Sequence, residues 1–224
     1  MKIIALSDLH GNLPNTKVQS DIVIIAGDFS PLYCQIDYNR SFDWLHKKFI
    51  PWALKLNTNK VLFIAGNHDF VCTFSYFKSE FNRILKICKA TDKLVYLERS
   101  GIKIDNKYFY GIPDTESPDG WAFSRPFGID YSFPSNVDVL ITHQPPRINN
   151  VGYVRKYNKE LGSIDLRNEI LASNIELNIC GHIHTCDHNP NLITLNNGKS
   201  ATIQNVSILD EEYQVAYYPA IIEI

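Results

Sequence analysis

The sequence lacks the features that would place it in a membrane, on a nucleic acid or in a disulfide-bonded class. No apolar run is long enough to span a bilayer. Lys and Arg number 22 against 24 Asp and Glu, and the resulting net charge of −2 gives no basic footprint for nucleic acid. The five cysteines are scattered and include no Cys-x-x-Cys pair, which argues against a disulfide framework. We therefore expect a cytoplasmic protein in a reducing setting, with no membrane attachment and no obligate protein partner.

What is present indicates one α/β domain over residues 1–224. Apolar, β-branched runs predict strands at 2–6, 21–26 and 60–65, and these alternate with amphipathic helices. One helix covers 42–56 and is kinked or restarted by Pro51, and the next has Thr73 as its cap. A hairpin is predicted at 102–110, and a helix capped by Ser163 follows a loop at 145–162. The last predicted strands are 192–195, 201–204, 215–218 and 220–223.

Five short polar segments each follow one of the apolar runs, and they contain five of the seven histidines. Polar residues just past the carboxyl ends of strands can converge on one crevice. Carboxylate, amide and imidazole groups together suit a pair of divalent metal ions. The segments are Asp8-Leu9-His10-Gly11-Asn12, Gly27-Asp28-Phe29, Gly66-Asn67-His68-Asp69, Thr142-His143 and Gly181-His182-Ile183-His184.

In this order the segments resemble the calcineurin-like metallophosphoesterase superfamily, and most closely its small metallophosphoesterase-domain phosphodiesterases. The shared pattern is Asp-x-His, Gly-Asp, Gly-Asn-His-Asp/Glu, a lone His and Gly-His-x-His, and here it extends over residues 8–184. The resemblance implies an α/β fold in which two mixed β-sheets pack as a central sandwich flanked by helices. It also implies that this four-layer αββα arrangement carries a dinuclear metal site at the carboxyl ends of the strands.

The resemblance further implies a role for each ligand. Asp28 occupies the position that bridges the two ions. The first ion would be completed by Asp8, His10 and His184, and the second by Asn67, His143 and His182. Mixed imidazole and oxygen ligation favours two divalent ions among Mn, Fe, Zn, Co and Ni, and we expect Mn to support activity in vitro.

The resemblance assigns His68 to the reaction and not to a metal. The matching histidine of the family lies beside the phosphate and protonates the leaving oxygen or stabilises charge, as an imidazolium can. Its acid partner is either Asp69, which is adjacent in sequence, or Asp28.

Residues 113–136 form a long predicted loop that is too aromatic for disorder. Two interpretations are open. Trp121 and Phe123 could stack on a base while Arg125 binds a phosphate, or the aromatic residues form the loop's own small core with Arg125 on the surface.

Together these features predict a metal-dependent phosphoesterase that uses a water activated by two metals for in-line hydrolysis of a phosphodiester, with a nucleotide, including a cyclic one, as a candidate substrate. The sequence Gly27-Asp28-Phe29-Ser30-Pro31 lacks the arginine that the protein Ser/Thr phosphatases carry after Gly-Asp, and Asp69 stands where they have Glu. A phosphomonoesterase acting on protein or small-molecule phosphates is the alternative. A non-catalytic scaffold on the same fold is a third, although every ligand position is filled.

Each residue taken alone has a plainer interpretation. Asp8 and Asp28 could be turn or helix caps, and His143 could be a hydrogen-bonded loop residue. The order of the five segments, each after a strand, is what favours metal ligation.

Overall fold

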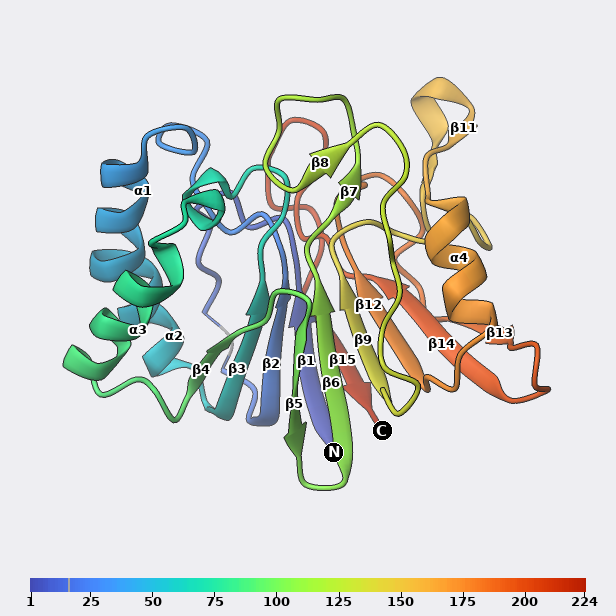
Figure 1. The fold of residues 1–224 in the computed structure, drawn as a ribbon, viewed down its shortest axis with the longest axis horizontal. Coiled ribbons are helices and arrows are strands. Elements are labelled where there is room, and N and C mark those ends of the chain that lie inside the picture. Colours follow the sequence, from blue (N-terminus) through green and yellow to red (C-terminus); the bar gives the residue numbers. More distant parts are fainter. Residues whose placement is uncertain (16) are drawn as a thin grey trace.

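The computed structural model describes residues 1–15 and 17–224, and two mixed β-sheets form its centre (Figure 1). The five-stranded sheet has the order β15-β1-β2-β3-β4, with bounds Ala220–Glu223, Lys2–Leu6, Ser20–Ala26, Thr58–Ile64 and Leu94–Tyr96. The six-stranded sheet has the order β13-β14-β12-β9-β6-β5, with bounds Asn191–Thr194, Ser200–Asn205, Leu177–Cys180, Val139–Thr142, Lys107–Ile112 and Ser100–Ile104. In both sheets the inner strands are parallel and an antiparallel strand lies at an edge.

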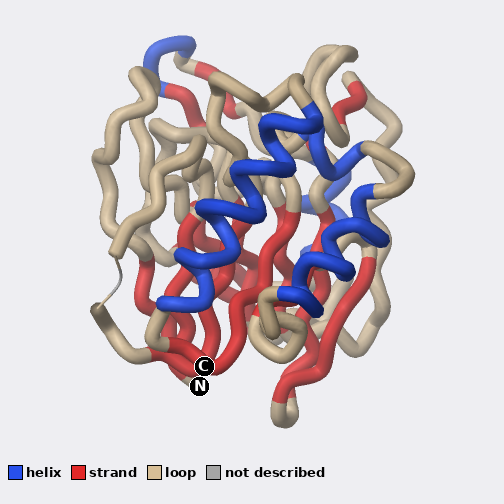
Figure 2. Tube along the Cα trace, turned by 90° about the vertical axis from the view of Figure 1, so that its left-hand side faces the viewer, coloured by secondary structure: helices blue, strands red, loops and turns tan. Residues whose placement is uncertain are grey.

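Three apolar cores separate four layers, which confirms the predicted sandwich. The middle core lies between the sheets, where Ile24 and Leu62 of one face Val139 and Ile179 of the other. An outer core joins the five-stranded sheet to α1 (Tyr38–Trp44), α2 (Ile50–Lys55) and α3 (Phe77–Ile87). The other outer core joins the six-stranded sheet to α4 (Ile164–Leu171). Figure 2, turned toward the first set of helices, shows them lying across the strands.

The helix predicted over 42–56 is interrupted where the sequence indicated. A π-helical turn at Leu45–Phe49 separates α1 from α2, and Pro51 lies in the first turn of α2. The missing N–H of Pro51 therefore falls where the hydrogen-bond pattern changes from π-helical to α-helical. Ser163 caps α4 as predicted, since its hydroxyl accepts the N–H of Leu166 at 3.1 Å.

Two predictions about elements were wrong. Thr73 does not cap α3: it ends the 3-10 helix Phe70–Thr73, and its hydroxyl donates back to the carbonyl of Phe70. Helix α3 begins at Phe77, after a residue without a side-chain cap. Residues 215–218 are not a strand, because the N–H groups of Ala216 and Tyr217 both donate to the carbonyl of Ile208, so no ladder forms.

The two long loops contain short paired segments. In the first, β7 (Thr115–Glu116) pairs with β8 (Ser124–Arg125). In the second, β10 (Tyr153–Val154) pairs with β11 (Lys159–Glu160) around the 3-10 turn Arg155–Tyr157. Both loops lie on the same side of the molecule in Figure 1, beyond the carboxyl ends of β1, β2, β3, β9 and β12. The termini meet at the opposite end.

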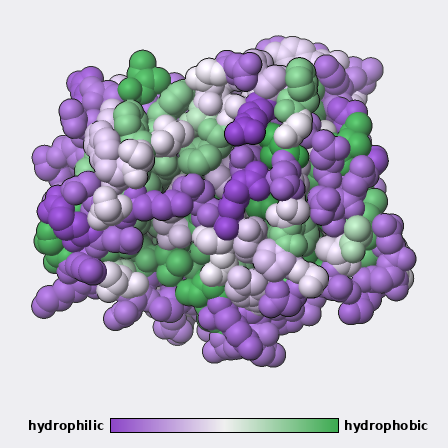
Figure 3. Space-filling view, in the orientation of Figure 1, coloured by the Kyte–Doolittle hydropathy of each residue, from purple (hydrophilic) through white to green (hydrophobic). Residues whose placement is uncertain are grey.

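The outer surface gives little further direction. On the face drawn in Figure 3, hydrophobic side chains form small separate patches among hydrophilic ones. Within residues 1–15 and 17–224, none of the helices has the length and apolar character required to cross a membrane. The candidate functional groups are therefore those of the polar loops at the strand ends.

Candidate metal centre

The loops after β1 and β2 present Asp8 and Asp28 with left-handed backbones, at φ 56° and 52°. The loops hold one another: the N–H of Asp8 donates to the carbonyl of Gly27 at 3.0 Å, and that of His10 to the carbonyl of Asp28 at 2.9 Å. Non-glycine residues at positive φ are uncommon and cluster at functional sites. The pairing of the two loops is therefore what brings two buried carboxylates together.

Two glycines allow this close approach. A Cβ atom on Gly66 would lie 2.6 Å from Nε2 of His143 and against the carboxylate of Asp28. A Cβ atom on Gly181 would lie 2.6 Å from Oδ2 of Asp8. Both contacts are shorter than a real Cβ contact, so any larger side chain must displace a predicted ligand.

The imidazoles of the second sheet are oriented by backbone carbonyls. Nδ1 of His143 donates to the carbonyl of Ala26 and Nδ1 of His184 to that of Asp210, both at 2.8 Å. Each ring therefore turns Nε2 toward a carboxylate. In His143 this atom is 3.2 Å from Asp28 and in His184 it is 3.4 Å from Asp8. Such outer hydrogen bonds fix the tautomer of metal-binding histidines.

His10 provides the sharpest test of whether a cation fits. Both of its ring nitrogens are buried and have no hydrogen-bond partner among the described residues. Asp8 and Asp28 are 0% and 2% exposed, and within the described chain they pair with histidines and with no lysine or arginine. Buried carboxylates, and a buried imidazole without a hydrogen-bond partner, are unfavourable without a compensating cation. This donor set fits divalent metal.

The potential ligands form three interlocking groups, and within each the ligand atoms lie within 4.8 Å of one another. Each group shares a carboxylate with its neighbour, which is the arrangement that two adjacent ions require. The groups are Asp8, His10 and His184; Asp8, Asp28 and His143; and His10, Asp28 and His68.

The electrostatics agree with a site that accommodates positive charge. Burial opposes protonation of His143, but Asp28 and Asp8 outweigh it and raise its pKa to about 9. Burial likewise opposes protonation of His184, and its contact with Asp8 raises the pKa to about 9. Burial alone would raise the pKa of Asp8 and of Asp28, yet the surrounding histidines hold both below the usual range. Burial lowers the pKa of His10 to about 4, which leaves it neutral.

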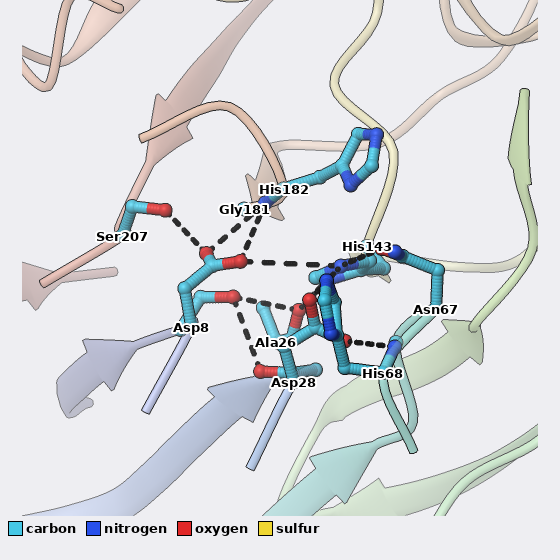
Figure 4. A network of polar contacts seen from close by, with 12 residues as sticks. Asp8, Ala26, Asp28, Asn67, His68, His143, Gly181, His182 and Ser207 are labelled. Carbon is cyan, nitrogen blue, oxygen red and sulfur yellow. Dashed lines mark hydrogen bonds and ion pairs between the residues drawn. The ribbon is translucent and has the colours of Figure 1, made fainter. Parts of the chain in front are cut away.

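Asn67 and His182 complete the predicted ligand set. Oδ1 of Asn67 lies 3.2 Å from Nε2 of His143. His182 has φ 69°, so its segment is not extended, although the ring still lines the cavity and lies 5.2 Å from that of His143. Figure 4 shows the His182 ring apart from the carboxylates, while its backbone N–H donates to Asp8 at 3.0 Å. The sequence did not indicate Ser117, whose hydroxyl lies 3.3 Å from Nε2 of His182.

His68 lies beside the ligands, and neither Asp69 nor Asp28, the two carboxylates named as its acid partner, forms a hydrogen bond with its ring. Nδ1 of His68 is 2.6 Å from Oε1 of Gln35, a residue that no sequence motif indicated. The carboxylate of Asp69 points elsewhere and accepts the N–H groups of Gly66, Ser30 and Phe29 at 2.8, 2.8 and 3.3 Å. Asp69 is therefore a positioning residue that ties the third loop to the second. The one hydrogen bond between His68 and Asp28 is donated by the backbone N–H of His68, at 2.7 Å, and not by its ring.

The long loop delivers one of its aromatic residues to the site. The ring of Trp121 lies 4.6 Å from that of His68, and the N–H of Ala122 anchors it by donating to the carbonyl of Asn67. Phe123 packs against the core between the five-stranded sheet and its helices, and not in a core of the loop's own. Arg125 is exposed and lines a different hollow with Asp114, so its position gives no support to a substrate contact.

A cavity of about 330 Å³ opens above the ligands. Asp28, Asn67, His68, His182 and His184 contribute to it from the strand ends. Its other walls come from the second long loop and from the turn after β14, through Val154, Lys156, Tyr157, Glu211 and Tyr213. A small anionic group that reaches this cavity would meet the ligands directly.

Comparison with known proteins agrees with the arrangement. The sequence model of a family described as "Calcineurin-like phosphoesterase" matches residues 1–186, which include every predicted ligand. Metallophosphoesterase domain-containing protein 1 of Homo sapiens is 25% identical over 245 residues, which cover 100% of this chain and 71% of that protein. UPF0046 protein T07D4.2 of Caenorhabditis elegans is 26% identical over 191 residues, which cover 73% of this chain and 46% of that protein.

One solved structure is also similar. Its description is "Structural and Functional Characterization of a Novel Archaeal Phosphodiesterase", and it aligns over 99% of this chain and 100% of its own. The TM-score is 0.43 and the sequence identity is 16%.

Proposed function

Because the chain belongs to the calcineurin-like phosphoesterase family, we propose that it hydrolyses phosphodiesters, cyclic nucleotides among them, with two divalent metal ions held at the strand ends. The observation that carries this proposal is that Asp8 and Asp28 lie in one ligand group with His143. Asp8 is shared with the group of His10 and His184, and Asp28 also lies beside His10 and His68, the proposed proton donor. One buried carboxylate that serves two groups suits a bridged pair of ions.

The residues divide into two proposed ligand sets. Asp28 would bridge the ions. Asp8, His10 and His184 would hold the first, and Asn67, His143 and His182 the second. A bound metal pair supplies Lewis acidity, which activates water and neutralises charge on the phosphate oxygens. Manganese is the ion with which we would test activity first.

His68 supplies proton chemistry in this proposal. The acceptor Oε1 of Gln35 places a proton on Nδ1, so that Nε2 is left to face the cavity. Burial lowers the pKa of His68 and the nearby Asp28 opposes this; when Nε2 carries a proton, it donates to the leaving oxygen or holds charge beside it. Trp121 covers the other face of the ring and restricts its orientation.

The test is metal content together with ester preference. Protein purified without chelators should contain about two metals per chain. With manganese it should hydrolyse bis(p-nitrophenyl) phosphate faster than p-nitrophenyl phosphate. Preference for the monoester would replace the proposal with a phosphomonoesterase. Absence of metal and of activity after reconstitution would leave a non-catalytic scaffold as the remaining alternative.

A second test separates His68 from the ligands. His68→Ala should lower kcat by about 100-fold, the lower end for a general acid, while metal content stays normal. Gln35→Ala should produce a smaller loss of the same kind. Loss of metal from His68→Ala would move this residue into the ligand set.

A further inference from the structure

Tyr213 has a backbone that a bulky residue rarely adopts, with φ 59°. The turn around it is built by Asp210, whose Oδ1 accepts the N–H groups of Glu212 and Gln214 at 3.0 and 2.8 Å. The N–H of Tyr213 donates to the carbonyl of Asp210, the same carbonyl that orients His184. The unusual conformation is thus maintained by a specific turn, and what it achieves is the placement of the phenol ring.

The phenol ring of Tyr213 packs against the rings of two predicted ligands, His10 and His184. It lies edge-on to His10 at 4.9 Å between centroids and edge-on to His184 at 5.5 Å. Because of this position it lines two hollows at once. One is the cavity above the ligands, and the other is a hollow of about 460 Å³ on the far side. We call the second one the Tyr33 hollow, lined by His10, Gly11, Asn12, Pro31, Leu32, Tyr33, Trp44 and Tyr213.

The two hollows differ in chemistry. The cavity above the ligands carries His68 together with Lys156 and Glu211, whose charged groups lie 3.5 Å apart. Among the residues that the structure describes, the lining of the Tyr33 hollow has no lysine, arginine or carboxylate, and its one titratable group besides the two tyrosines is His10. Leu32 and Tyr33 present large apolar surfaces there, with 39% and 71% exposed. This hollow therefore suits an uncharged planar group.

We propose that the Tyr33 hollow binds the retained ester group of a phosphodiester, an aryl group or a nucleobase, and that Tyr213 separates it from the leaving group. This inference rests on the proposed function. A tetrahedral phosphorus that directs two oxygens toward the ligands must direct its two ester groups away from them. His68 belongs to the other cavity, so the leaving oxygen that it protonates lies there. The remaining ester group then lies on the His10 side, where Tyr33 and Leu32 can pack against it.

The test uses p-nitrophenyl diesters that share one leaving group and differ in the retained group. Water oxygen bonds to phosphorus as the bond to p-nitrophenolate breaks, and the phosphomonoester of the retained group and a proton are released. For wild type we expect a KM for phenyl p-nitrophenyl phosphate about 5-fold below that for the methyl ester, because an aromatic contact is available. The thymidine 5′ ester distinguishes a nucleobase from a simple aryl group, and whichever binds more tightly identifies the preferred source.

Leu32→Arg places a longer, charged side chain in the hollow, and Leu192→Arg is the matched control on an exposed strand outside it. Leu32→Arg should raise the KM of the phenyl ester to about that of the methyl ester, whereas Leu192→Arg should leave both KM values, kcat and metal content at the wild-type level. Tyr33→Ala should act in the same direction. Equal KM values in wild type, or equal losses for both esters in Leu32→Arg, would overturn the inference while the proposed function stands. No hydrolysis of any ester by metal-loaded wild type would overturn the proposed function itself.

Discussion

The two sheets contribute different chemistry to one site. The loops of the five-stranded sheet supply the oxygen donors Asp8, Asp28 and Asn67, and hydrogen bonds between those loops hold them. The six-stranded sheet supplies His143, His182 and His184. Two of these are turned by backbone carbonyls, one of which, that of Ala26, belongs to the other sheet. The first sheet therefore supplies the negative charge of the site together with His10, and the second supplies three imidazoles, two of which are oriented by a carbonyl of the first sheet and one of the turn after β14.

The largest effect should come from removing the shared charge. Asp28→Asn takes a carboxylate from two of the three ligand groups, so metal content and hydrolysis of bis(p-nitrophenyl) phosphate should fall together, by more than about 100-fold in activity. Asp105→Asn is the control, since it lies at the tip of the β5–β6 hairpin, where asparagine tolerates the φ of 53°. Normal activity in Asp28→Asn would remove the bridging role.

The counterpart on the second sheet is His143→Ala. It takes an imidazole from one ligand group and leaves both carboxylates, so we expect one retained metal per chain and activity lower by about 100-fold. Metal analysis of the purified variant provides the measurement. If both metals were lost, as expected for Asp28→Asn, the division between a sheet that supplies charge and a sheet that supplies imidazoles would not hold.

A smaller effect on metal binding should follow from removing a hydrogen bond that holds a predicted ligand in place. The hydroxyl of Ser207 donates to Asp8, and Ser207→Ala removes this bond without removing a ligand. We expect about 10-fold weaker metal binding, measured by competition with a chelator, because outer partners contribute about that much. Ser20→Ala is the matched control, since the buried hydroxyl of Ser20 has no partner among the described residues. Equal affinity in both variants would show that Asp8 is held by its loop alone.

The smallest effect on activity is expected from Trp121, which lies beside His68 at the rim of the cavity. Trp121→Ala should raise the KM for nucleotide substrates by about 5-fold, and by less for bis(p-nitrophenyl) phosphate, because only the nucleotide offers a base to stack. Phe127→Ala is the control, as Phe127 belongs to the same loop and is 81% exposed. Equal changes for both substrates would mean that Trp121 only supports His68.

The sequence predicted the elements that depend on local chemistry. Strands β1, β2 and β3 follow from their apolar runs, the restart at Pro51 from its missing N–H, and the cap of α4 from Ser163. Prediction from the sequence failed where a hydrogen bond to another segment determines the backbone conformation. Residues 215–218 have a strand-like composition, yet their N–H groups donate to one carbonyl, that of Ile208.

The amino-acid sequence by itself determined the identity and order of the polar segments, because each needs only a strand end and a turn. Tertiary structure decided which groups face one another. Asp69 is adjacent to His68 in the chain, but its carboxylate is drawn to three backbone N–H groups, and Gln35, 33 residues away, takes its place. The ring of Tyr213 packs edge-on against His10, some 200 residues earlier in the chain, because the side chain of Asp210 stabilises the turn that contains Tyr213. Contacts of that range depend on which strand ends are neighbours within a sheet and on how the two sheets pack, and no local pattern encodes them.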